Sequence, residues 1–254
     1  MNVLGFDTAT PSTAVALRLH DGTVLETRDD PPPGAHPGHA TRLLAMAAAL
    51  LSRAGTGWQE LQRIAVGVGP GTFTGLRVGV ATARGLAQSL GAEPVGVSSS
   101  LALARCAQAH EPSLTGARGA VLAVTDARRG EVFAAAYERG EDGLPRALAG
   151  PLALAPALLG DFAAAAATAR AGAGDGARWL AVGDGALRYA ECLPAAAIEP
   201  APPGSPLHLV SAAAVCELGA LAPAGELHAL APDYRRRPDA ELALADAGRQ
   251  AVLR

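Results

Sequence analysis

The chain has 254 residues, half of them hydrophobic and 18% charged, so it can bury one large core or two modest ones. Its net charge of −3 argues against free-standing nucleic-acid binding, because neutralising phosphates needs a basic face. The sequence has no lysine, which excludes lysine Schiff-base chemistry. Its three cysteines are widely spaced and odd in number, a pattern that indicates neither a disulfide framework nor a zinc site and fits a reducing cytosol.

The sequence also argues against a membrane or secreted location. We find no uninterrupted apolar run of about eighteen residues, the length that a membrane span needs. The N-terminal apolar run has no basic region before it, and Asp7 interrupts it, so we expect no signal peptide and a cytoplasmic protein.

The first residues predict three strands joined by tight turns. A strand over residues 2–6 leads into a turn, a second strand covers 13–19, and the His20-Asp21-Gly22 turn leads into a third strand at 23–27. Asp7, Thr8 and Thr10 lie just beyond the first strand, where a carboxylate and two hydroxyls can hold a phosphate through water or a metal. The alternative is a turn aspartate that bonds its own backbone.

A proline-rich loop over residues 30–38 precedes a predicted helix over 39–54, which should end at Gly55. His36 and His39 suggest a metal site, but two ligands on one helix face need i, i+4 spacing. Here the spacing is three, and Pro37-Gly38 intervenes. We therefore expect a histidine at the helix start and no metal site.

The stretch GVGPGTFTGLRVG, residues 67–79, joins a strand at 63–68 to a helix that ends near Leu90, with Gly91 as its C-terminal cap. A P-loop would need Gly-Lys-Ser/Thr at its end, and a dinucleotide fingerprint would need a third glycine where Thr72 or Thr74 stands. A glycine-rich turn used only for internal packing is the remaining alternative.

Small residues recur every four positions along this second helix, at Gly75, Gly79 and Ala83. This spacing predicts a groove free of side chains in which another helix can lie. Both this helix and the one at 39–54 have a second side of low polarity, so we expect a partner to cover them.

The second half repeats the plan of the first. A strand at 94–97, a helix at 98–109 and a polar boundary at 110–118 come first. A strand at 120–125, a turn opened by Asp126 and a strand at 131–138 then repeat the strand, aspartate turn, strand unit. A further strand at 179–182 ends at Gly183-Asp184-Gly185 before a short helix to about residue 193. Residues 161–176 suit either a helix or a linker, 206–221 predicts a final helix, and the tail from residue 231 is expected to be partly mobile.

Five motifs together carry a family resemblance. The opening FDTAT, the histidine-led helix with LL, GPGTFTGLRVG, the turn DARRGEVF and the late P-D-Y-R-R resemble the bacterial TsaB (YeaZ) family over residues 2 to about 237. The resemblance implies a duplicated α/β fold of the actin-like (ASKHA, ribonuclease-H-like) class with two lobes, the second reduced. The expected lobes are residues 1–110 and 111–237, followed by a tail at 238–254.

The resemblance also implies a function. TsaB is the non-catalytic paralogue of the transferase subunit TsaD in the complex that installs N6-threonylcarbamoyl on adenosine 37 of tRNAs reading codons that begin with A. That complex uses ATP, Mg²⁺ and threonylcarbamoyl-adenylate, and includes TsaE. The implied partners are TsaD through a helix bundle, TsaE, tRNA only through the complex, and a second copy of the chain when it is alone. With the predicted groove, the interface would comprise His39, Leu43, Leu50, Thr72, Phe73, Gly75, Arg77, Gly79 and Ala83.

The resemblance further implies a reduced nucleotide site. The phosphate-loop positions would be Asp7, Thr8, Thr10, Asp126, Gly183 and Gly185, which are only the skeleton of an ATPase site. TsaD holds a metal with an H-x-x-x-H pair, and this sequence has no such pair. We therefore expect a scaffold without catalytic residues. The alternatives are an active ATPase or small-molecule kinase of the same fold and, with less support, a metal-dependent glycoprotease.

Overall fold

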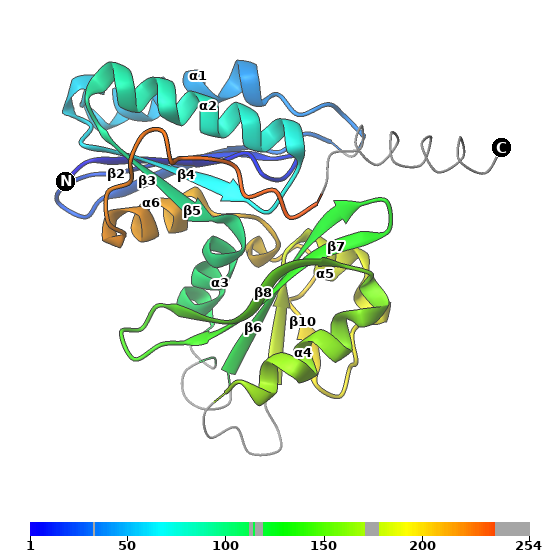
Figure 1. The fold of residues 1–254 in the computed structure, drawn as a ribbon. Coiled ribbons are helices and arrows are strands. Elements are labelled where there is room, and N and C mark those ends of the chain that lie inside the picture. Colours follow the sequence, from blue (N-terminus) through cyan, green and yellow to red (C-terminus); the bar gives the residue numbers. More distant parts are fainter. Residues whose placement is uncertain (33, 112–113, 115–118, 171–177, 237–254) are drawn as a thin grey trace.

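The computed structural model describes residues 1–32, 34–111, 114, 119–170 and 178–236, and it contains two five-stranded sheets (Figure 1). In the first sheet an antiparallel meander is followed by two strands parallel to β1, in the order β3-β2-β1-β4-β5. Its strands are β1 (Val3–Asp7), β2 (Thr13–Arg18), β3 (Val24–Asp29), β4 (Arg63–Gly69) and β5 (Glu93–Ser98).

The second sheet repeats this plan, in the order β10-β9-β6-β7-β8, with β6, β7 and β8 antiparallel and β9 and β10 parallel to β6. Its strands are β6 (Gly119–Arg128), β7 (Glu131–Arg139), β8 (Pro145–Leu154), β9 (Arg178–Val182) and β10 (Ile198–Pro200). The predicted strands correspond to observed ones. Strands β8 and β10 were not predicted. Two prolines and a glycine in β8 weaken its strand signal, and β10 has only three residues.

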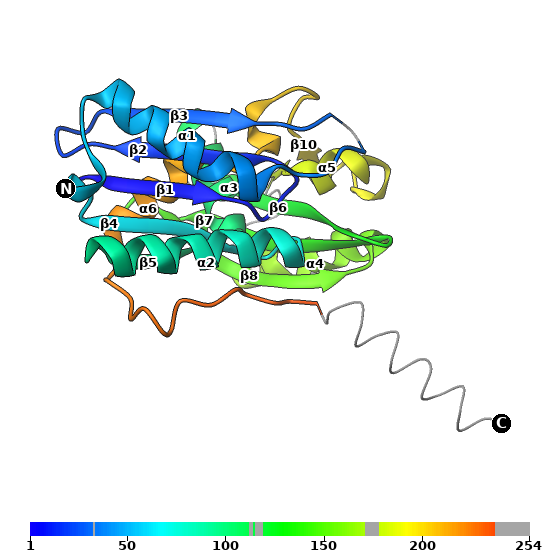
Figure 2. The same cartoon turned by 90° about the horizontal axis from the view of Figure 1, so that it is seen from above.

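The helices cover both faces of each sheet (Figures 1 and 2). Helices α1 and α2 lie on the outer face of the first sheet, α3 and α6 lie between the sheets, and α4 and α5 pack on the second sheet. Their bounds are α1 (His39–Ala54), α2 (Phe73–Leu90), α3 (Ser99–His110), α4 (Leu159–Thr168), α5 (Asp184–Arg188) and α6 (Ala212–Leu221), with short 3-10 turns at Trp58–Glu60, Pro156–Leu158, Ala190–Cys192 and Pro206–His208.

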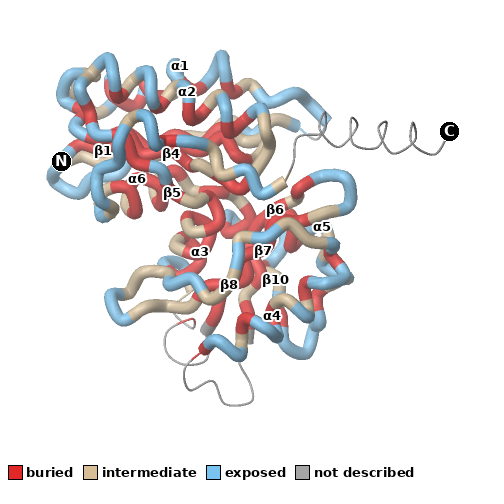
Figure 3. Tube along the Cα trace, in the orientation of Figure 1, coloured by how far each residue is buried: buried red, intermediate tan, exposed pale blue. Residues whose placement is uncertain are grey.

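The buried side chains form three layers that follow the alternation of the strands. Leu4 and Phe6 of β1 point to the cluster under α1 and α2, whereas Val3 points to the middle cluster with α3 and α6. The middle cluster also contains Val121 and Tyr137 from the second sheet, so one apolar layer joins the two halves of the molecule. Figure 3 shows this buried interior and the exposed outer side of α1 and α2.

Helix α6 packs on the first sheet although it comes late in the sequence. At its N-terminus Glu26 accepts a hydrogen bond from the Ala212 N–H at 2.7 Å, and at its C-terminus Arg63 donates to the carbonyls of Gly219 and Ala222, both at 2.8 Å. Both charges complement the helix dipole. Helix α6 thus packs on the sheet of the first half although it comes after the predicted lobe boundary at residue 110. The boundary itself stays a prediction, and its residues 112–113 and 115–118 lie outside the described residues.

Capping decides where several helices begin and end. Helices α1 and α2 end at Gly55 and Gly91, each with φ of 66°, as predicted. The predicted helix over 206–221 is instead broken. Its first residues form a 3-10 turn, and α6 starts only after Ser211, whose hydroxyl accepts a hydrogen bond from the Ala214 N–H.

Residues 222–236 form an extended segment along β5, which we call the C-terminal strap (Figure 2). The Gly225 N–H donates to the Pro94 carbonyl at 3.0 Å, Leu230 is buried, and the Asp233 N–H donates to the Val68 carbonyl at 2.7 Å. The part of the predicted tail up to Arg236 thus packs on the first sheet, and its mobility stays a prediction. Residues 237–254 and 171–177 lie outside the described residues.

Within the described part of the chain, no helix combines the length and apolarity that crossing a membrane requires. The expected cytoplasmic location stays a prediction.

Candidate functional site

Asp7 ends β1 and is almost fully buried, with an exposed fraction of 1%. Its carboxylate accepts hydrogen bonds from the Ser99 hydroxyl at 2.6 Å and the Ala9 N–H at 2.8 Å. Burial raises the pKa of Asp7, and these two hydrogen bonds oppose that rise. A Cβ at Gly67 would collide with the same carboxylate, so Gly67 leaves room for it. Asp7 therefore holds the turn together, which is the alternative that the sequence left open.

The two threonines of this turn have different surroundings. Thr8 is buried, and its hydroxyl donates to the Gly75 carbonyl at 2.7 Å, which ties the turn to the first residues of α2. Thr10 is half-buried and precedes Pro11, which lines a cavity between the two halves of the molecule. Of the first predicted phosphate loop, only the segment at Thr10 lies beside this cavity.

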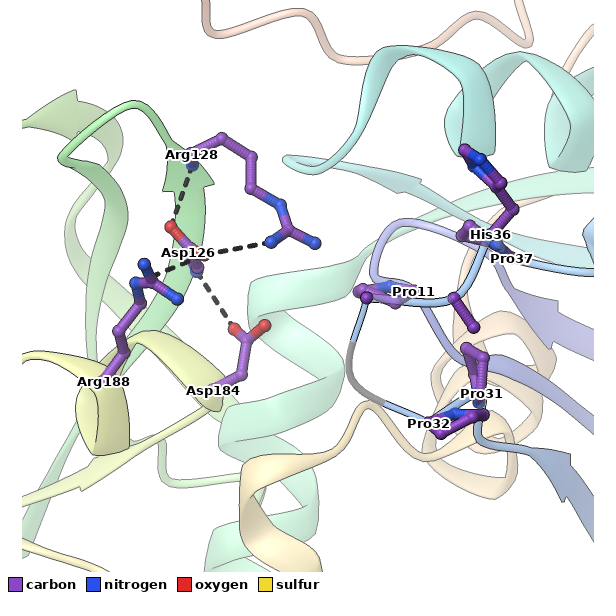
Figure 4. Close-up of a pocket in the computed structure, with 11 residues that line it drawn as sticks. Pro11, Pro31, Pro32, His36, Pro37, Asp126, Arg128, Asp184 and Arg188 are labelled. Carbon is purple, nitrogen blue, oxygen red and sulfur yellow. Dashed lines mark hydrogen bonds and ion pairs between the residues drawn. The ribbon is translucent and has the colours of Figure 1, made fainter.

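The cavity has a volume of about 600 Å³. One wall comes from the second half of the chain, from the end of β6 and from α5, and carries Asp126, Arg128, Asp184 and Arg188. The other wall comes from the first half, with Pro11 of the β1–β2 turn and with Pro31, Pro32, Gly34, Ala35, His36 and Pro37 of the proline-rich loop. Figure 4 shows the charged wall facing the proline wall. We call this cavity the interlobe cleft.

Asp126 is the centre of the charged wall (Figure 4). Its backbone N–H donates to Asp184 Oδ1 at 3.0 Å, and its carboxylate accepts from the Arg128 N–H at 2.9 Å. The guanidinium groups of Arg128 and Arg188 lie 3.6 and 3.8 Å from Asp126 Oδ2. Burial raises the pKa of Asp184, and the Asp126 carboxylate adds to the rise. The wall thus holds two carboxylates beneath two arginines.

Gly183 and Gly185 let the start of α5 approach β6 closely. Gly183 has φ of 97°, and a Cβ there would collide with the Val124 carbonyl oxygen, while one at Gly185 would lie 2.8 Å from the Thr125 carbonyl carbon. The structure thus places Asp126, Gly183 and Gly185 together and places Asp7 and Thr8 elsewhere. Whether any of them binds phosphate stays a prediction.

The sequence analysis did not select Arg128, Asp184 or Arg188. Arg128 lies in the DARRG turn opened by Asp126, and Asp184 and Arg188 are four residues apart on one helical turn. That spacing, directly after the strand predicted at 179–182, was the available signal.

His36 and His39 have separate surroundings. His36 lines the interlobe cleft, whereas His39 is 5% exposed and its Nδ1 lies 2.8 Å from the Thr13 hydroxyl. Burial lowers the pKa of His39, so neutral imidazole is favoured there. Among the residues that the structure describes, no group of three or more histidine, cysteine, aspartate or glutamate side chains is placed to hold a metal ion.

The predicted groove on α2 is not open to a partner. Gly75, Gly79 and Ala83 are all buried: a Cβ at Gly75 or Gly79 would collide with Thr8 of the chain's own first turn, and Ala83 belongs to the apolar cluster beneath the helix pair. The expectation of an external groove is therefore wrong. These small residues are needed because the Thr8 turn lies directly against the helix.

Most other residues of the predicted interface face inward. His39, Leu43 and Leu50 are buried beneath α1, and Thr72 and Phe73 are half-buried, whereas Arg77 is exposed with its guanidinium 3.7 Å from the centre of the Phe73 ring. Apart from Arg77, the outward face of the helix pair is made of residues outside the predicted interface, most of them small: Ala40, Thr41, Leu44, Ala45, Ala48, Ala49 and Ser52 of α1, and Thr74, Arg77, Ala81, Arg84, Gly85, Gln88 and Ser89 of α2. We call it the helix-pair face.

Comparison with known proteins gives a consistent family. Residues 31–165 match the family model described as TsaD, tRNA N6-adenosine threonylcarbamoyltransferase. The Escherichia coli tRNA threonylcarbamoyladenosine biosynthesis protein TsaB is 40% identical over 146 residues, which cover 57% of this chain and 58% of that protein. The chain's match thus spans little more than half the length of this relative.

Solved structures extend the similarity over most of the chain. YeaZ from Pseudomonas aeruginosa is 29% identical, with a TM-score of 0.72 over 92% of this chain and 99% of that one. A ROK hexokinase from Thermus thermophilus, 19% identical, covers 86% of this chain and 99% of its own with a TM-score of 0.50, and shows the fold alone. The expected two-lobe actin-like fold and the resemblance to TsaB (YeaZ) are confirmed.

Proposed function

Because the chain belongs to the tRNA N6-adenosine threonylcarbamoyltransferase family, and its named relatives include TsaB, we propose that it is an accessory subunit in threonylcarbamoyladenosine synthesis. In this proposal it has no catalytic residue of its own. It binds the transferase subunit TsaD, and through it TsaE, and is required for transfer of threonylcarbamoyl to N6 of adenosine 37 in tRNAs that read codons beginning with A. ATP, Mg²⁺ and threonylcarbamoyl-adenylate are used by the complex.

The helix-pair face is the observation that carries this proposal. It exposes Leu44, with an exposed fraction of 48%, among small uncharged residues that include Ala45, Ala48, Ala81 and Gly85. Small side chains let a second pair of helices approach closely, and an exposed apolar patch of this kind marks an interaction site. The partner is therefore expected to add helices to α1 and α2.

The charge of the two helices points to the character of that partner. Helices α1 and α2 contain Arg42, Arg53, Arg77 and Arg84 and no acidic residue, although the whole chain has a net charge of −3. Complementary potentials across an interface raise the association rate and exclude wrong partners. We therefore expect acidic residues around the apolar contact on the transferase subunit. Without that subunit, self-association through the same face would bring like charges together.

The geometry of the first turn supports the accessory role. In an ATPase of this fold, the aspartate that ends β1 would have to face bound Mg²⁺ or nucleotide. Here Asp7 is closed in by Ser99 and the Ala9 N–H, and four of the seven residues that line the wall opposite Asp126 are prolines, which have no N–H to offer a phosphate. No observation favours the alternative of an ATPase or small-molecule kinase.

Reconstitution tests the proposal. A mixture of TsaD, TsaE, ATP, Mg²⁺, threonylcarbamoyl-adenylate and unmodified tRNA should modify adenosine 37 only when this chain is added. The chain with adenylate and tRNA alone should give no modified nucleoside. Modification by the chain alone, or an unchanged yield without it, would contradict the accessory role.

A further inference from the structure

The turn between β6 and β7 holds an unusual backbone conformation. Arg128 and Arg129 have φ of 67° and 54°, in the left-handed region, and Gly130 follows with φ of 76°. For residues other than glycine this region is strained, because Cβ comes too close to the following carbonyl oxygen. Such conformations persist only where the surroundings impose them, and they cluster at functional sites.

Contacts from two directions impose this conformation. From within the turn, the Arg128 N–H donates to Asp126 Oδ1 at 2.9 Å. From the C-terminal strap, Arg236 donates to the Ala127 carbonyl at 2.5 Å and its guanidinium lies 3.7 Å from the Glu131 carboxylate. The strap thus fixes the turn that carries Arg128 at the interlobe cleft.

The two arginines of the charged wall remain accessible. The side chains of Arg128 and Arg188 are 56% and 61% exposed, whereas that of Asp126 beneath them is 8% exposed. The two ion pairs with Asp126 are long, at 3.6 and 3.8 Å, and a guanidinium has five N–H donors. Arg188 also lies 5.7 Å from the centre of the Tyr189 ring. A molecule that enters the cleft therefore meets guanidinium N–H groups before it meets carboxylates.

The proline wall offers a different surface. Pro11, Pro31, Pro32 and Pro37 present ring faces and no N–H donor (Figure 4). The volume of about 600 Å³ lies within the range of roughly 300–1,000 Å³ seen for small-molecule sites. An apolar wall opposite a few convergent polar groups is the usual composition of such sites.

We propose that the interlobe cleft binds a small organic oxyanion with a flat ring, its anionic group on Arg128 and Arg188 and its ring against the prolines. Phosphate monoesters and carboxylates share this chemistry, because guanidinium pairs with both. A magnesium triphosphate fits less well, because Asp126 already has two arginine partners and the proline wall supplies few N–H groups. The proposal concerns the isolated chain and is independent of its role in tRNA modification.

Titration calorimetry of the full chain with phenyl phosphate, benzoate, inorganic phosphate and magnesium-ATP tests it. Phenyl phosphate or benzoate should bind saturably and more tightly than inorganic phosphate, and which of the two is tighter identifies the anion. The double variant Arg128→Gln/Arg188→Gln should lose about tenfold or more in affinity. Arg146→Gln is the matched control, because Arg146 is also 56% exposed and paired with a carboxylate, that of Glu138 on the neighbouring strand.

Urea unfolding of each variant shows whether it is folded. Affinity that is unchanged in the folded double variant, loss of affinity in Arg146→Gln, or no saturable binding of either ring compound by the wild-type chain would overturn the proposal. Binding of magnesium-ATP that is tighter than that of both ring compounds would also overturn it.

Discussion

The Arg77 Nε donates a hydrogen bond to the Tyr234 hydroxyl at 3.0 Å, which joins α2 to the C-terminal strap across 157 positions of sequence. The centres of the Tyr234 and Phe73 rings lie 5.1 Å apart, and the Arg77 guanidinium lies over the Phe73 ring, 3.7 Å from its centre. The strap is therefore fixed at the glycine-rich loop as well as at the β6–β7 turn.

Replacing Tyr234 by alanine should destabilise the fold by about 1–2 kcal/mol, because it removes an aromatic pair and the partner of Arg77. Tyr234→Phe keeps the ring and should cost less than about 0.5 kcal/mol, since the lost hydrogen bond is solvent-exposed. The free energy of unfolding in urea measures both. Equal values for the two variants would show that the ring contact contributes nothing.

Two glycines of α2 should respond in opposite directions to alanine. Gly79→Ala should destabilise the isolated chain by about 1–3 kcal/mol, because the new Cβ collides with the Thr8 hydroxyl. Gly85 is exposed and a Cβ there meets nothing within 4 Å, so Gly85→Ala should stabilise the helix by about 0.5–1 kcal/mol. Thermal unfolding of the pair gives the comparison. If Gly79→Ala left the stability unchanged, the result would support the hypothesis of an external groove on α2.

Asp7 should act through its hydrogen bonds and not through its charge. In Asp7→Asn the side-chain oxygen still accepts from the Ala9 N–H, so we expect a change in unfolding free energy within about 1 kcal/mol. Asp7→Ala leaves the Ser99 hydroxyl and this N–H without an acceptor and should cost about 2–4 kcal/mol. Reversed effects in urea unfolding would refute the structural role.

His39 should make stability depend on pH. Burial lowers the pKa of His39 in the folded chain below its ordinary value of 6.5, so on acidification the unfolded chain takes up a proton before the folded chain does. Its contribution to stability is therefore present above the unfolded pKa and is lost as pH falls from there towards the folded pKa. His39→Gln should reduce the loss of stability between about pH 7.5 and 5. An identical pH profile in the variant would show that His39 is not the group responsible.

The sequence predicted most elements because their signals are local. The apolar run of β1, the 3.6-residue spacing of α1 and the glycines at 55 and 91 can all be recognised without knowing the fold. Contacts between residues far apart in the sequence were harder to predict. The stripe of Gly75, Gly79 and Ala83 indicated close packing correctly, but nothing local showed that the Thr8 turn, and not another chain, fills the space.

The charged wall and the strap show the same limit. Arg128, Asp184 and Arg188 converge only because β6 and β9 are neighbours in the second sheet, and Arg236 reaches the β6–β7 turn only through the strap. Charged residues in turns and tails ordinarily suggest a solvated surface, so their meeting could be seen only in three dimensions.

The proposed binding of TsaD to the helix-pair face can be measured by calorimetry with the transferase subunit of the same organism. Leu44→Glu and Ala81→Glu place a carboxylate on the face that we expect to meet acidic residues, and each should weaken binding about tenfold or more. Leu221→Glu is the control, because Leu221 is also an exposed leucine, 62% accessible, but lies at the end of α6. We expect Leu221→Glu to bind TsaD with wild-type affinity and the two variants of the helix-pair face to bind more weakly. Wild-type affinity for Leu44→Glu and Ala81→Glu would contradict binding at this face.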